Sequence, residues 1–176
     1  MGWSTLNKPK YQTTKEWFLS NWSGIDYEIL DVACVGYTEL YAAVKNKVTG
    51  EVVAITYMIN HMPKSYFNFG YKCMDETVMP YMFNCPERIM KLLTPTNNEY
   101  ANAWRSNVWK VLTNAKILKK NCIVETTEII NFTNGYSGNM FKKIGKHVFA
   151  LNSDKSYNCQ VNLKLKKHEF KLIEYC

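Results

Sequence analysis

The sequence predicts an α+β fold, in which an antiparallel β-meander with short packed helices is followed by a small, basic, barrel-like all-β module. Three observations lead to this class. Consecutive stretches at 26–36, 39–48 and 51–60 are rich in β-branched and aromatic residues. Capping patterns typical of helices lie on both sides of them. Beyond residue 116 short apolar stretches alternate with turn residues, and 47% of all 176 residues are hydrophobic, enough for a buried core.

The first predicted helix begins after Thr13. Glu16 stands three residues later, which is the spacing of a capping box, and Trp17 and Phe18 follow at once. We expect this helix to pack its aromatic residues on the core. The three β-rich stretches come next, and a turn at Thr49-Gly50 joins the second to the third in a hairpin.

Two more helices are expected between the meander and the C-terminal module. Asn84 is a candidate N-cap for a helix that has Pro86 in its first turn and runs to about Leu93. Thr96 is a candidate N-cap for the next helix, which runs to about Leu112. We therefore place the first domain at residues 1–115.

The C-terminal module, residues 116–176, is predicted to be a small twisted sheet or barrel. Stretches 146–151, 157–167 and 169–175 have the composition of strands. Turns are expected at Asn134-Gly135, Ser137-Gly138 and Asn152-Ser153.

Charge is distributed unevenly along the chain. Residues 1–108 carry ten Lys or Arg and ten Asp or Glu, whereas residues 109–176 carry twelve lysines, no arginine and five acidic residues. The whole net charge of +7 thus lies in the C-terminal part. This asymmetry indicates attraction to phosphate or to an acidic protein surface, with solubilising lysines as the plain alternative. The lack of arginine in this part argues against base-specific readout.

Several function classes lack their sequence signatures. The chain contains no Gly-rich phosphate loop, no GxSxG elbow and no HExxH motif, and its six cysteines form no CxxC pair. Its apolar stretches are too short to span a bilayer, and its first residues lack the apolar region of a signal peptide. We expect a cytoplasmic protein with reduced thiols and no membrane contact.

The segment at 66–88, YFNFGYKCMDETVMPYMFNCPER, combines aromatic residues with charged ones. If it is extended, Lys72 and Glu76 share one face and Asp75 lies on the other. Adjacent carboxylates beside a lysine suit phosphodiester cleavage, in which Mg²⁺ would be the cofactor, so these three residues are the candidate catalytic set. A surface salt bridge is the alternative.

Other interpretations of this segment remain open. Tyr66, Asn68 and Tyr71 are candidates for binding a partner or stacking on bases, but such aromatic clusters are more often part of a core. A hydrolase of small substrates would use Cys85 or Cys73 as a nucleophile, with His61 as its base, or else the acid pair Asp75 and Glu76. No metal-binding cluster is expected from the cysteine and histidine spacing.

The blocks NFGYK-x-MDET at 68–77 and NCP-x-x-I-x-x-LLTPT at 84–96 resemble a domain family of obscure function that phages, plasmids and conjugative elements carry. MGW at the start, YANAWR at 100–105 and, less distinctively, FTNG at 132–135 and FKLIEY at 170–175 extend the resemblance over most of the chain. The family often has an acidic residue between the Lys and the Met. Here that position is Cys73, so one potential metal ligand is missing.

In size and genetic setting this family is similar to anti-CRISPR proteins of type II systems, some of which block guide RNA loading and some of which shorten the guide RNA with the effector. The resemblance implies a counter-defence protein, in the cytoplasm of a bacterial host, whose partners are a type II CRISPR effector and its guide RNA. The alternatives are a non-catalytic nucleic-acid-binding accessory protein of a mobile element and a small-substrate hydrolase. The expected RNA-binding residues are lysines, namely Lys142, Lys143, Lys146, Lys164, Lys166 and Lys167.

Overall fold

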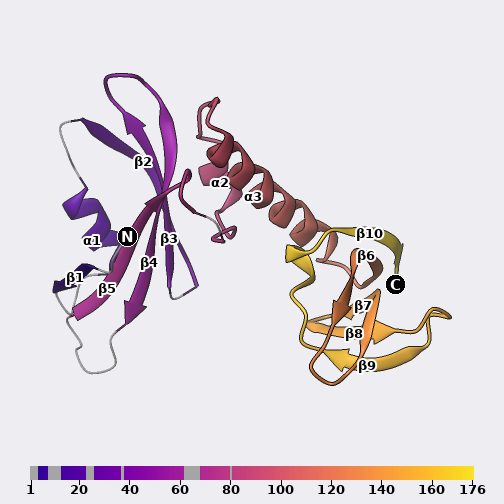
Figure 1. Ribbon diagram of the computed structural model, residues 1–176. Coiled ribbons are helices and arrows are strands. Elements are labelled where there is room, and N and C mark those ends of the chain that lie inside the picture. The colour runs from indigo at the N-terminus through magenta and orange to yellow at the C-terminus, as the bar shows by residue number, and fades with distance from the viewer. Residues whose placement is uncertain (1–3, 8–12, 23–25, 37, 62–67, 80) are drawn as a thin grey trace. The chain divides into compact units, whose positions relative to one another are not determined.

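The computed structural model has the α+β fold that the sequence predicts, and it describes residues 4–7, 13–22, 26–36, 38–61, 68–79 and 81–176. The chain divides into two compact units, Met1–Trp109 and Lys110–Cys176, each built on one five-stranded antiparallel sheet (Figure 1). The division falls within helix α3 (Glu99–Ile117), whereas the sequence analysis placed it after residue 115. Within the described part of the chain, no helix has the length and apolar character that crossing a membrane requires.

The sheet of the first unit contains the predicted meander and its hairpin. Its strands are β1 (Ser4–Asn7), β2 (Tyr27–Val35), β3 (Glu39–Asn46), β4 (Val52–His61) and β5 (Asn68–Asp75), in the spatial order β1-β5-β4-β3-β2. At the β3–β4 turn the Asn46 backbone N–H donates to the Glu51 carbonyl at 2.8 Å. Gly50 has a φ of 75°, a left-handed conformation that glycine adopts at little cost.

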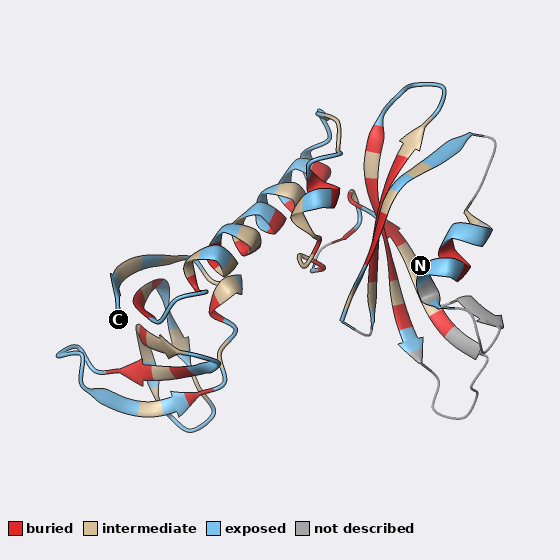
Figure 2. Cartoon of the chain, turned by 180° about the vertical axis from the view of Figure 1, so that it is seen from behind, coloured by how far each residue is buried: buried red, intermediate tan, exposed pale blue. Residues whose placement is uncertain are grey.

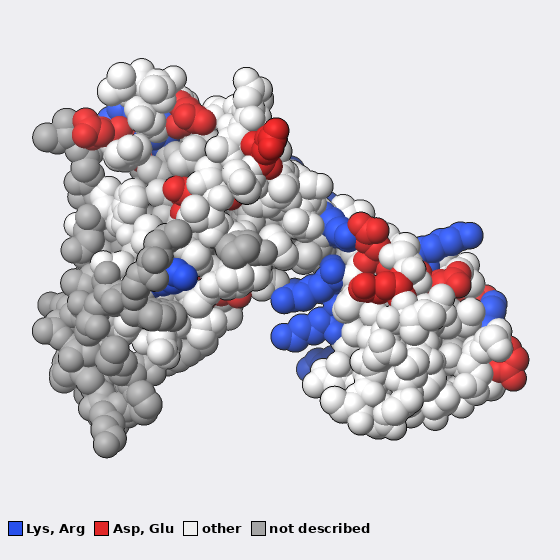
Figure 3. All heavy atoms as spheres, viewed as in Figure 1, with Lys and Arg blue, Asp and Glu red and all other residues white. Residues whose placement is uncertain are grey.

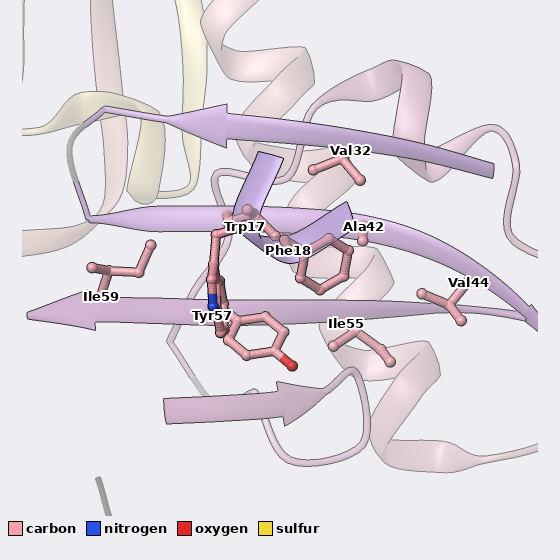
Figure 4. Close-up of a cluster of buried hydrophobic side chains, with 9 residues drawn as sticks. Trp17, Phe18, Val32, Ala42, Val44, Ile55, Tyr57 and Ile59 are labelled. Atoms are coloured by element: carbon pink, nitrogen blue, oxygen red, sulfur yellow. The ribbon is translucent and has the colours of Figure 1, made fainter. Parts of the chain in front are cut away.

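Helix α1 (Thr14–Asn21) covers one face of this sheet. The predicted capping box is present, because the Glu16 N–H donates to Thr13 Oγ1 at 3.2 Å and the Thr13 N–H donates to Glu16 Oε2 at 2.7 Å. Trp17 and Phe18 are buried against Tyr57, with ring centroids 5.8 and 5.1 Å away (Figure 4). The prediction that this helix packs its aromatic residues on the core is confirmed.

The opposite face of the sheet is covered by the chain that follows β5. Short helix α2 (Glu87–Met90) packs on β2 and β3, and Ile89 in it is fully buried. Trp104 on α3 is buried and its Nε1 donates to the Met82 carbonyl at 2.9 Å. Both faces of the first sheet are therefore covered, and Figure 2 shows the buried residues along its central strands.

The starts of both helices differ from the prediction. Helix α2 begins after Pro86 instead of Asn84, and the Asn84 amide nitrogen donates to the Glu39 carboxylate at 3.3 Å. Helix α3 follows Asn98, whose Oδ1 accepts the Ala101 N–H at 3.0 Å, whereas Thr96 Oγ1 only accepts the Asn98 N–H. Short polar side chains compete for the N-cap position, and spacing alone does not decide among them.

The second unit has a sheet in the order β10-β6-β7-β8-β9. Its elements are β6 (Cys122–Asn131), β7 (Ser137–Ile144), β8 (His147–Leu151), β9 (Tyr157–Val161), the 3₁₀ helix η1 (Leu165–Lys167) and β10 (Phe170–Tyr175). Residues 110–176 are all described, and β10 and β9 are the two edges of an open sheet, so the expected barrel-like closure is not found.

The core of the second unit lies on one face of this sheet. Phe141 and Val124 are fully buried there with Leu165 of η1. The stretch predicted as a strand over 157–167 ends at Val161, because the chain turns to bring Leu165 into this core. The turns at Asn134-Gly135 and Asn152-Ser153 are present, whereas Ser137-Gly138 begins strand β7.

Candidate functional site: a lysine–aromatic face on the second sheet

The candidate catalytic residues lie at the end of β5 and in the turn after it. Lys72 is half-buried in the strand, and its side chain has no hydrogen-bond or ion-pair partner within the described residues. Asp75 is exposed, and its Oδ1 accepts the Thr77 backbone N–H at 2.9 Å, so its carboxylate closes the turn. Alternation along the strand directs Lys72 and Asp75 to opposite faces of the sheet.

Glu76 is buried, with 2% of its side chain exposed, and is part of a two-pronged ion pair with Arg105. Arg105 Nε donates to Oε2 at 2.8 Å and Nη2 donates to Oε1 at 2.7 Å. Its third nitrogen, Nη1, donates to the Thr94 carbonyl at 2.5 Å. Both carboxylate oxygens are thus occupied by one guanidinium, and the pair joins the β5 turn to helix α3 and to the loop before it.

Cys85 is fully buried in the same region, next to Glu76 and Tyr41. Burial, and then the charge of Glu76, raise the pKa of the Cys85 thiol far above its usual range. A cysteine nucleophile needs the opposite, a lowered pKa and an accessible sulfur. The surroundings of Cys85 therefore do not support it as the nucleophile of a hydrolase.

The structure does not assemble the three candidate catalytic residues into one site. Asp75 holds a turn, Glu76 is buried with Arg105, and Lys72 lies on the other face from Asp75. Among the described residues, no group of three or more His, Cys, Asp or Glu side chains is placed to hold a metal ion. Of the candidate partner-binding residues, Tyr71 packs on the α1 core, Asn68 pairs with Asn7 through its backbone, and Tyr66 lies outside the described residues.

A pocket of about 250 Å³ adjoins the Glu76–Arg105 pair in the first unit. Met79, Phe83 and Trp104 line it, and Tyr100 at its edge is 74% exposed. Its wall is mainly apolar, and its one carboxylate is already paired. A ligand in this pocket would make mainly apolar contacts. The described lining residues leave no free carboxylate for acid–base catalysis or for metal binding.

The candidate RNA-binding lysines all lie in the second unit, on β7, at the β7–β8 turn and around η1. Lys142 and Lys143 are neighbours on β7 and point to opposite faces of the sheet. Lys143 Nζ donates to the Gly145 carbonyl at 2.6 Å, and Lys146 is exposed at the turn. Figure 3 shows lysine side chains projecting from more than one side of this unit.

The other three lysines lie where η1 meets α3. Lys164 precedes η1, and Lys166 and Lys167 lie within it. Asn114 Nδ2, from the last turns of α3, donates to the Lys166 carbonyl at 3.2 Å and to the His168 carbonyl at 2.9 Å. The backbone of these lysines is therefore fixed, which reduces the entropy that binding an anion would cost.

The face of the second sheet that lies opposite its core has a row of lysine, aromatic and amide side chains. Strand pairing places Lys142 beside Phe149 and Phe149 beside Gln160. Lys142 Nζ lies 5.3 Å from the centre of the Tyr157 ring, and the Tyr157 and Phe149 rings meet edge to face at 5.6 Å. We call these residues, with His147, the lysine–aromatic face (Lys142, His147, Phe149, Tyr157 and Gln160).

Exposure and charge distinguish this face from an ordinary packed surface. The Tyr157 side chain is 55% exposed, and His147 and Gln160 are exposed. A hydrogen bond with Tyr157 raises the pKa of Lys142 above its usual value. An exposed tyrosine ring beside a lysine is a surface that single-stranded nucleic acids can bind, by stacking on the ring and pairing phosphate with lysine.

Sequence reasoning identified Lys142 but missed the other four residues of this face. One signal was present. In the predicted strand 146–151, alternation separates His147, Phe149 and Leu151 from Val148 and Ala150. The partner residues on β9 were not predictable without the register, which has an irregularity between Ala150 and Leu151.

Comparison of the chain with protein-family models, with curated proteins and with solved structures found no match.

Proposed function

We propose that this protein binds single-stranded RNA on the lysine–aromatic face of its second unit, and that it acts as a counter-defence protein by sequestering the guide RNA of a type II CRISPR effector. The observation that carries the binding proposal is the contact of Lys142 with the exposed Tyr157 ring beside Phe149. The effector and its guide RNA as partners come from the sequence resemblance alone.

The charge distribution supports a nucleic acid as the ligand. The second unit carries the entire net positive charge of the chain, whereas the first is balanced. A basic surface raises the local concentration of RNA and speeds its association. A basic protein is a poor mimic of DNA, so competition by phosphate mimicry is disfavoured.

Sequestration is the mode we propose, instead of guide RNA cleavage. Cleavage through Asp75 and Glu76 would need free carboxylate oxygens for Mg²⁺. Both oxygens of Glu76 are bonded to Arg105, and Asp75 is held in its turn. Binding on the second sheet needs neither residue.

The test combines RNA integrity with effector loading. The full-length protein is incubated with guide RNA and Mg²⁺ before or after a type II effector is added, and the samples are run on native and denaturing gels. We expect a shifted but intact RNA, and less effector loading when the protein is added first. Tyr157→Ala should weaken the shift, whereas Tyr81→Ala, which removes a similarly exposed tyrosine of the first unit (51% exposed), should not.

Two results would contradict the proposal. A shortened guide RNA that appears only with effector, protein and Mg²⁺ together would make the protein a ribonuclease. An unshifted RNA would remove the binding proposal altogether. RNA binding without any effect on effector loading would instead support the accessory-protein alternative.

A further inference from the structure

A second pocket lies at one end of the lysine–aromatic face and shares two of its residues. It has a volume of about 370 Å³, within the range of roughly 300–1,000 Å³ that small-ligand sites have. His147 and Gln160 line it together with Lys146, Asn162 and the apolar residues Val148, Val161 and Leu163. The row of rings Tyr157, Phe149 and His147 therefore leads into it, with centroids 5.6 and 6.4 Å apart.

Part of the polar lining of this pocket is free to bind a ligand. An amide nitrogen donates, so the 3.1 Å contact runs from Gln160 Nε2 to His147 Nδ1. Within the described residues, Gln160 Oε1, Asn162 and Lys146 have no hydrogen-bond or ion-pair partner, which leaves an acceptor, an amide and a cation unused.

We propose that this pocket, which we call the β8–β9 pocket, takes one unstacked nucleobase of the bound RNA strand and gives the protein a base preference. The proposal rests on the proposed function, since the strand is held by the neighbouring rings. Asn162 and Gln160 present the donors and acceptors that read a base edge, and Lys146 is placed for the adjoining phosphate.

The composition of the pocket favours a base over a simple anion or an apolar ligand. A phosphate site would gather several cations or backbone N–H groups, but Lys146 is the single cation that lines this pocket, whose residues are all described. Two amides and an imidazole match the mixed edge of a base. The lack of arginine in this part of the chain does not exclude readout, because amide side chains also make bidentate contacts with bases.

The experiment measures the affinity of the full-length protein for three labelled ten-nucleotide RNAs, oligo(A), oligo(C) and oligo(U), at one salt concentration. A bidentate base contact is worth about 1–3 kcal/mol, so the best and worst oligonucleotides should differ by about fivefold or more. Asn162→Ala, at an exposed position, should reduce this difference without abolishing binding, and Gln160→Ala should reduce the difference as well. Asn60→Ala, at an exposed amide of the first unit, is the matched control and should leave the preference unchanged.

The failure of this inference is distinguishable from the failure of the proposed function. Tight binding of all three oligonucleotides with equal affinity overturns the base pocket and leaves RNA binding intact. A preference that persists unchanged in both pocket variants comes from stacking and overturns the pocket as well. If none of the three RNAs binds, both the proposed function and the pocket are wrong.

Discussion

The two units of this protein use their charged and aromatic residues in opposite ways. In the first unit the sheet is covered on both faces, and its most distinctive segment places Glu76 and Tyr71 inside the structure. In the second unit the main core cluster lies on one face, and the other displays Lys142 and Tyr157 beside the buried Ile123 and Leu151. The unusual segment of the first unit therefore serves mainly to pack the fold. The accessible charged and aromatic side chains that could bind a partner lie in the second unit.

The largest expected effect tests the structural role of the first unit. Glu76→Gln leaves the Arg105 guanidinium buried without its counter-charge, which costs about 3–5 kcal/mol of folding free energy. Asp75→Asn changes an exposed turn residue and should cost less than about 1 kcal/mol. Urea unfolding of the two variants measures this difference.

The same pair of variants separates structure from catalysis. If the urea midpoint of unfolding is the same for Glu76→Gln as for the wild-type protein, the ion pair does not hold the segment in place. If the Glu76→Gln variant is folded but loses an activity of the wild-type protein, Glu76 has a functional role. The contrast between a first unit that uses these residues for packing and a second unit that binds a partner would then be wrong.

The next effect concerns the exposed rings. Tyr157→Ala removes one stacking surface and the partner of Lys142, so RNA affinity should fall by about 1–3 kcal/mol, or roughly 5- to 150-fold. Fluorescence anisotropy with a short single-stranded RNA measures the loss. The matched variant Tyr81→Ala alters a tyrosine of similar exposure in the first unit. If the two variants lose the same amount of RNA affinity, the Tyr157 ring is not a specific binding site for the RNA.

The smallest effect is on salt dependence. Lys142→Gln removes one phosphate contact, so the slope of log affinity against log salt should become shallower by about 0.7 for single-stranded RNA. Lys15→Gln, on the exposed side of α1, should leave the slope unchanged. The measurement is a titration at four or five salt concentrations. An unchanged slope for Lys142→Gln would mean that this lysine meets no phosphate.

Local patterns in the sequence were enough to predict the fold class, the β3–β4 hairpin and the capped α1 helix. Each depends on neighbouring residues, such as Thr13 with Glu16, or on the turn preference of Gly50. The 3₁₀ turn at η1 was missed because Leu163 and Leu165 alternate as in a strand. Burial of Leu165 in the core decides that conformation, and burial is a property of the whole unit.

The candidate site was less predictable than the fold. The Glu76–Arg105 pair joins residues that are 29 positions apart, and no local pattern links them. The lysine–aromatic face depends on the register of β7, β8 and β9, which the sequence leaves open. Sequence reasoning therefore found the basic module and Lys142, but not the rings beside it.

Ultraviolet cross-linking of the full-length protein to a guide RNA, followed by mass spectrometry of the linked peptides, tests the central claim most directly. We predict cross-links at Tyr157, Phe149 or His147 on the second sheet, and their loss when unlabelled single-stranded RNA is added in excess. Cross-links confined to residues 66–88 would contradict the assignment, because they would place the RNA on the segment that we interpret as packing.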